Sequence, residues 1–153
     1  MFSIFLKKAI NYFSDSEKEK IRTAIQEAEK STTGEVRIFV EHYCKHGNAV
    51  VRAAEVFHNL KMDETADRNG VLIYIALSHK RMAIYADSGM YSKVEPGFWD
   101  EMLHKMQGHF KKEKFAEGII SAIHDIGLKL AGFFPDGSLE KNDKPDELVF
   151  GKR

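Results

Sequence analysis

Five polar residues at the borders of apolar segments carry the side chains with which this sequence could do chemistry. They are Glu35, Asp67, Arg68, Asn69 and Asp87. Carboxylate and amide oxygens are the hard ligands that calcium and magnesium prefer, so one interpretation is a divalent-cation site. A second is that Arg68 holds a phosphate group while Asp87 acts as a metal ligand or base for hydrolysis. The third is purely structural, with Arg68 neutralising Asp87 and Asn69 capping a turn.

Sequence periodicity predicts the elements that hold these residues. The stretch SDSE at 14–17 has the form of a capping box, so a helix is expected to begin there. Alternation at 35–41 predicts a strand, and helical spacing predicts a second helix over about 47–60. An unbroken apolar run at 71–77 predicts a buried strand, and the short connection after it predicts a hairpin with 82–86. The second helix is expected to face the core with Val50, Val51, Ala54, Phe57 and Leu60.

The order of these elements predicts which loops meet. Strand, helix, strand is typical of a right-handed parallel crossover. If the first two strands are parallel and the hairpin then reverses direction, Glu35, the 68–69 pair and Asp87 share one edge of the sheet. Two further helices are predicted, from Pro96 and from Phe115. Together these elements predict an α/β fold with a mixed sheet whose second strand is covered by helices on both faces.

Other candidates for chemistry are weaker. The segment 42–46 holds two histidines and a cysteine, but without a second ligand pair we expect a surface segment and not a zinc site. No base for a nucleophilic Cys44 can be identified, so a buried or inert thiol is expected. The sequence has no H-E-x-x-H, G-x-S-x-G, Walker or G-x-G-x-x-G motif, which disfavours the enzyme and nucleotide-binding families that depend on them.

Composition limits the number of domains and the kinds of partner. A chain of 153 residues, 43% hydrophobic and 30% charged, fits one globular domain with its own core. Acidic and basic residues balance at 23 each, which argues against a nucleic-acid partner. The single cysteine cannot form an internal disulfide, so a cytoplasmic location is expected.

We expect both ends of the chain to differ from a central domain at 14–135. Residues 1–13 are apolar apart from a few interruptions such as Lys7 and Lys8, are too short to span a bilayer and lack a signal-peptide cleavage site. An amphipathic helix docked on the domain is expected there, with a membrane-surface or partner-binding helix as the alternative, and no transmembrane segment. Residues 136–153 are expected to form a charged surface tail whose apolar triplet, 148–150, is docked or frayed.

Three short motifs point to a known family. They are G-E before the first strand, R-N-G-V-L-I at the second and D-x-G after the third. With the surrounding stretches TTGEVRIFVE, AAEVFHNLKMDETADRNGVLIYIAL, MAIYADSGM and FWDEMLHKMQGHFKKEKFAEGIISAIHDIGLKL, they resemble the TPM domain, also called the TPM phosphatase family, over about residues 13–135. The ending NDKPDELVFGK is similar to the tail of stand-alone bacterial members.

The resemblance implies a three-layer α/β/α sandwich around a small mixed sheet, with Rossmann-like layering. Divalent-metal binding and weak acid-phosphatase activity have been attributed to the family, and plant thylakoid relatives are associated with repair of photosystem II. We therefore expect a monomeric accessory domain that binds calcium, or alternatively magnesium, and assists an unidentified protein complex. A metal-assisted phosphate-ester hydrolase with Arg68 and Asp87 as catalytic residues is the first alternative, and a metal-free interaction module is the second. The expected metal ligands are Asp87, Asp67, Glu35 and Asn69.

Overall fold

The computed structural model describes residues 12–136 and 148–150 of the chain. The helix predicted at 1–13 therefore lies outside the described residues except for its last two positions, as does most of the predicted tail. The elements are α2 (Asp15–Glu29), β1 (Glu35–Glu41), η1 (Lys45–Gly47), α3 (Ala49–Asn59), η2 (Met62–Glu64), β2 (Gly70–Ala76), β3 (Arg81–Ala86), α4 (Ser88–Tyr91), α5 (Phe98–Lys111), α6 (Phe115–Phe133) and β4 (Leu148–Phe150).

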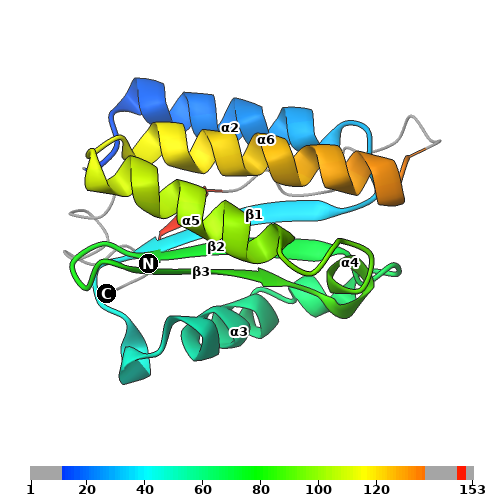
Figure 1. Cartoon of the computed structure of the whole chain (residues 1–153), viewed down its shortest axis with the longest axis horizontal. Coiled ribbons are helices and arrows are strands. Elements are labelled where there is room, and N and C mark those ends of the chain that lie inside the picture. The colour runs from blue at the N-terminus through cyan, green and yellow to red at the C-terminus, as the bar shows by residue number, and fades with distance from the viewer. Residues whose placement is uncertain (1–11, 137–147, 151–153) are drawn as a thin grey trace.

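The sheet has the strand order β3-β2-β1-β4 (Figure 1). β1 runs parallel to β2, and β2 pairs with β3 as an antiparallel hairpin, which confirms the predicted crossover and hairpin. The tail triplet is docked, because β4 pairs in parallel with residues 38–40 of β1. β1 is therefore an inner strand, a point that the sequence left open.

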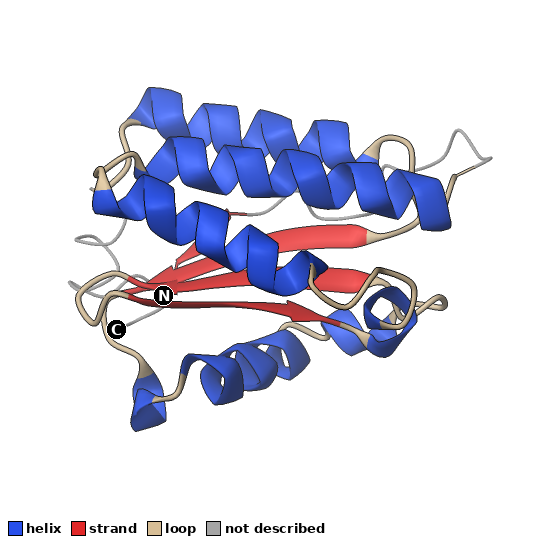
Figure 2. Cartoon of the chain, viewed as in Figure 1, coloured by secondary structure: helices blue, strands red, loops and turns tan. Residues whose placement is uncertain are grey.

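Helices cover both faces of the sheet and form the expected three-layer α/β/α sandwich (Figures 1 and 2). α2, α5 and α6 pack on one face, where Val36, Ile38 and Val40 of β1 are fully buried. α3 packs on the other face, against Leu72 and Tyr74 of β2. All seven residues of β2 are buried, as the unbroken apolar run predicted.

A capping box and a glycine determine where α2 begins and how closely it packs on α6. The predicted capping box is present, since Ser14 Oγ accepts a hydrogen bond from Glu17 N (3.1 Å) and Glu17 Oε1 accepts one from Ser14 N (2.8 Å). α2 then lies close to α6 because Gly127 has no side chain. A Cβ at Gly127 would stand 2.8 Å from the Cβ of Ala28.

The structure corrects the predicted phase of α3. Asn48 caps this helix by accepting from Val51 N (3.1 Å), so the helix begins at Ala49 and its first turn points outward. Val50 and Val51 are 64% and 53% exposed and do not face the core as predicted. Phe57 is fully buried as predicted, while Ala54 and Leu60 are half-buried. The other buried positions of α3 are Ala53 and Val56.

Two smaller differences concern the helices that follow the hairpin. α4 is a four-residue helix that the sequence patterns did not indicate, and α5 starts at Phe98 after a Gly97 N-cap rather than at Pro96. α5 packs on the sheet through Met102 and Met106, which are buried. Within the described part of the chain, no helix combines the length and the apolar character that a membrane span requires.

Candidate functional site

Strand register brings the three predicted polar loops to one edge of the sheet. Glu35 is the pairing partner of Gly70 on the parallel neighbour, and Asp87 N donates to Gly70 O at 2.9 Å on the antiparallel side. The loops before β1, before β2 and after β3 therefore meet at the right end of the sheet in Figure 1, beside α4. We call residues 33–35, 65–70 and 87–89 the rim.

The strongest contact in the rim joins Arg68 to Asp87. Arg68 Nε lies 2.8 Å from Asp87 Oδ2 and Nη2 lies 2.9 Å from Oδ1, which is a bidentate ion pair. Asp87 is 4% exposed and also caps α4, because Oδ1 accepts from Ser88 N at 2.8 Å. Burial would raise the pKa of the Asp87 carboxyl, but the hydrogen bonds from Arg68 and Ser88 outweigh it and the pKa lies below its ordinary value.

A second group in the rim is centred on Thr33. Its hydroxyl donates to Asp67 Oδ2 at 2.9 Å and accepts from Asn69 Nδ2 at 3.0 Å. Asn69 is fully buried, yet its Oδ1 accepts no hydrogen bond from the described residues. A buried acceptor without a hydrogen bond destabilises the fold by about 1–3 kcal/mol unless another donor or a cation binds to it.

The absence of a side chain at Gly89 lets the 67–68 turn pack closely against the start of α4. A Cβ there would stand 2.1 Å from Asp67 O and 2.7 Å from Arg68 O, so no other residue fits without moving the backbone. Arg68 itself has a left-handed backbone (φ 51°), and its carbonyl accepts from Met90 N at 3.2 Å. The D-x-G motif therefore locks the 67–68 turn against the start of α4.

Glu35 stands apart from this pair of groups. It and Asp87 flank Gly70 on opposite sides, two strand spacings or about 10 Å apart at the backbone. The space over Gly70 is filled, since a Cβ there would meet Met62 O at 3.2 Å and the Phe57 ring at 3.4 Å. Among the described residues, the Glu35 carboxylate has no hydrogen-bond or ion-pair partner.

The ligand atoms in the rim are of the type that divalent cations prefer, but they are few. Asp67, Asp87 and Asn69 contribute oxygen atoms only, which is the chemistry that calcium and magnesium prefer. Asn69 Oδ1 accepts no hydrogen bond from the described residues, so it is available as a ligand. The Arg68 guanidinium already provides a positive charge beside the Asp87 carboxylate. However, the described residues contain no group of three or more His, Cys, Asp or Glu side chains placed to hold a metal ion.

A buried polar cluster that the sequence analysis missed lies at the opposite edge of the sheet. Glu41 is 1% exposed and accepts from Arg52 Nε (2.8 Å), from Arg52 Nη2 (3.0 Å) and from the Tyr74 hydroxyl (2.5 Å). Burial, reinforced by the hydrogen bond to Glu41, raises the pKa of Tyr74 far above its usual range. Two acidic residues bounding a strand look alike in sequence, so nothing marked Glu41 as the buried one.

The histidine and cysteine segment lies beside this cluster. Cys44 is buried, as predicted, but His42 is also buried, which corrects the expectation that 42–46 lies wholly on the surface. His42 Nδ1 lies 2.9 Å from Ser78 Oγ, and His79 Nδ1 accepts from Cys44 N at 2.9 Å. These contacts hold the end of β1 to the β2–β3 turn.

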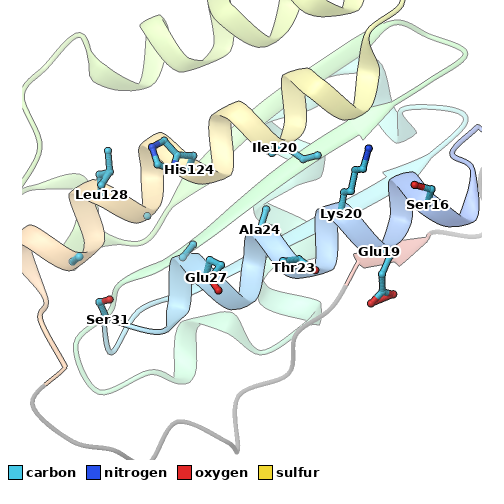
Figure 3. Close-up of a pocket in the computed structure, with 13 residues that line it drawn as sticks. Ser16, Glu19, Lys20, Thr23, Ala24, Glu27, Ser31, Ile120, His124 and Leu128 are labelled. Atoms are coloured by element: carbon cyan, nitrogen blue, oxygen red, sulfur yellow. The ribbon is translucent and has the colours of Figure 1, made fainter.

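A groove lies away from both edges, between the outer surfaces of α2 and α6 (Figure 3). Ala24 and Ile120 contribute apolar surface to it, while Lys20, Glu27 and His124 line its sides. It holds no pair of acidic and basic groups at bonding distance, so it offers less chemistry than the rim.

Comparisons with known proteins agree with this architecture. The family described as TPM domain matches residues 7–128. The NMR structure of BA42 protein from the psychrophilic bacterium Bizionia argentinensis is 37% identical, with a TM-score of 0.83 over 91% of this chain and 95% of that one.

Two more distant solved structures share the fold alone. One is the N-terminal domain of a protein from P. gingivalis, with 16% identity and a TM-score of 0.68 over 79% of this chain and 78% of that one. The other is an N-terminal domain from Corynebacterium glutamicum, with 12% identity and a TM-score of 0.64 over 87% and 84%. The comparison with curated proteins gives no match.

Proposed function

The chain belongs to the TPM domain family, and from this premise we propose that it is a binding domain whose rim takes up calcium in exchange for the Arg68–Asp87 ion pair. The observation that carries the proposal is the buried Asn69 Oδ1, an oxygen ligand without a hydrogen-bond donor among the described residues. Asp67, which is linked to Asn69 through the Thr33 hydroxyl, and Asp87 would supply the carboxylates. Magnesium is the less suitable ion, because it demands a regular octahedral ligand set.

The exchange follows from the different exposure of the two partners. The Arg68 side chain is 49% exposed, so it can rotate into water and become hydrated at little cost. The Asp87 side chain is 5% exposed and is fixed at the start of α4, so it stays in place and needs a new cation. With two carboxylates and one amide oxygen, the expected dissociation constant is in the weak range, about 10⁻⁴ to 10⁻³ M.

The same contacts favour binding over catalysis. A phosphate clamp would need the guanidinium of Arg68, and in this structure its Nε and Nη2 are both directed at Asp87. A carboxylate with a lowered pKa is also a poor general base near neutral pH. We therefore keep phosphate-ester hydrolysis as the alternative and propose that calcium orders the rim for a protein partner, such as a complex under assembly or repair.

Thermal unfolding of the full chain with and without calcium tests the proposal. At ten times the dissociation constant, linkage adds about 1.4 kcal/mol, or a rise in Tm of about 3–6 °C for a domain of this size. Asp87→Asn should abolish the rise, whereas Asp63→Asn, which alters a nearby acid outside the proposed ligands, should keep most of it. Equal loss in both variants would mean diffuse attraction to the acidic loops and would contradict a specific site.

The role of Arg68 separates the two candidate functions. If it competes with calcium for Asp87, Arg68→Gln should tighten calcium binding severalfold. Lys61→Gln is the matched control, because Lys61 is also cationic, near the same edge and left-handed in its backbone (φ 58°). Metal-dependent release of phosphate from p-nitrophenyl phosphate that disappears in Arg68→Gln would instead support the hydrolase.

A further inference from the structure

A second cavity, unrelated to the calcium proposal, lies at the end of the sheet opposite the rim. It has a volume of about 750 Å³, within the range of about 300–1,000 Å³ that small-molecule pockets span. Its walls are the β2–β3 turn and the connection between α5 and α6, both of which lie at the left in Figure 1. Segments 30 residues apart in sequence thus enclose one hollow.

The floor of this cavity is apolar. Ile75 is buried and Met82 is half-buried on the hairpin. Phe110 and Phe115 meet edge to face across the helix connection, with ring centroids 4.9 Å apart, and Tyr12 packs against Phe115 at 5.8 Å. An alkyl chain lying on this floor would remove apolar surface from water, which favours binding.

The exposed charged side chains that line the cavity, which we call its mouth, are mainly cationic. Lys80, Arg81 and Lys111 line it, against a single lining carboxylate, Glu113. Arg81 is held in place because its Nη1 donates to Gly47 O at 2.7 Å. Neither Lys80 nor Lys111 forms an ion pair with any residue that the structure describes, so their charges are not neutralised from within this part of the chain.

We propose that this cavity binds a single-chain anionic amphiphile, with its carboxylate between Lys80 and Lys111 and its alkyl chain on the aromatic floor. Charge complementarity selects the sign of the head group, since three cationic side chains at the mouth face a single carboxylate among the lining residues. The apolar floor selects a ligand with a hydrocarbon body over a purely polar anion such as free phosphate.

Laurate is the probe, titrated below its micelle concentration into the full chain and followed by amide chemical shifts. Shifts should concentrate at residues 75–77, 80–82 and 110–115. Dodecyltrimethylammonium has the same chain length with the opposite charge, and it should bind at least about tenfold more weakly. Equal binding of both probes would show that the tail alone drives association and would overturn the proposal.

Two neighbouring lysines supply matched variants. Lys111→Glu should weaken laurate binding by about tenfold, because it reverses a charge at the mouth. Lys112→Glu reverses the same charge one position later, at an exposed residue that does not line the cavity, and should have little effect. Chemical-shift changes on laurate addition that are confined to the α2–α6 groove would contradict binding at this cavity. Changes at the cavity that depend on protein concentration in the absence of laurate would also contradict it, because they would indicate self-association.

Discussion

Replacing Asp87 with alanine tests whether the rim is the rigid unit that its contacts indicate. The substitution removes a helix cap, which contributes about 1 kcal/mol, and a bidentate ion pair whose contribution is reduced to about 0.5–1 kcal/mol by the solvent around Arg68. The free energy of unfolding should therefore fall by about 2 kcal/mol. For a chain of this length, that corresponds to a decrease in Tm of about 4–8 °C.

Two companion variants separate the contributions. Asp87→Asn keeps an acceptor for Ser88 N and should lose about 0.5–1 kcal/mol, roughly the ion-pair part. Asp15→Ala removes an aspartate that is fully exposed in its pair with Lys18 and should stay within about 0.5 kcal/mol of the unmodified protein. Urea unfolding followed by circular dichroism measures all three. A loss in Asp87→Ala no larger than that in Asp15→Ala would refute the reasoning.

The lowered pKa of Asp87 adds a pH dependence with a defined sign. Its ordinary value is 3.8, and the folded-state pKa lies below that. The stabilisation is therefore fully present above about pH 4 and is lost as the pH falls through the folded-state pKa. The difference in unfolding free energy between the unmodified protein and Asp87→Asn should be constant from pH 5 to 8 and should shrink below pH 4. A difference that peaks in acid would contradict this assignment.

Three further substitutions probe the rest of the framework. Tyr74→Phe removes the buried donor to Glu41 and should lower the unfolding free energy by about 1–2 kcal/mol in urea unfolding, whereas a neutral result would mean that water replaces the hydroxyl. Gly89→Ala should disrupt the rim, with loss of the calcium-dependent rise in Tm, because its Cβ collides with the backbone of the 67–68 turn. Gly108→Ala, in a helix with open space around it, should instead stabilise by about 0.5–1 kcal/mol.

The sequence predicted the architecture well because the strands carry unambiguous patterns. Alternation in β1 and the unbroken apolar run of β2 defined the strands, and the short polar link after β2 implied the hairpin, so the meeting of the three loops followed from chain direction. The pairing of Arg68 with Asp87 was one of the alternatives considered, and it is the contact observed. The metal-binding role of the rim stays a prediction.

Other features depend on information that periodicity does not contain. β4 is a triplet, too short to show a pattern, and its place beside β1 depends on where the chain returns. The phase of α3 depends on Asn48 as the cap, and a start two residues earlier fits the apolar positions as well. The hydrogen bond from the Thr33 hydroxyl to Asp67 joins two loops that are 34 residues apart in sequence, so it depends on backbone geometry that periodicity does not predict.

The most direct test of the central claim is the side-chain Nε–H resonance of Arg68 during a calcium titration of the full chain. In the free protein this group donates to Asp87, so its chemical shift should differ from that in Asp87→Asn. If calcium displaces the guanidinium, the resonance should move toward the shift seen in Asp87→Asn as the rim amides saturate. A resonance that keeps its position while calcium saturates the protein would contradict the exchange of cations at Asp87.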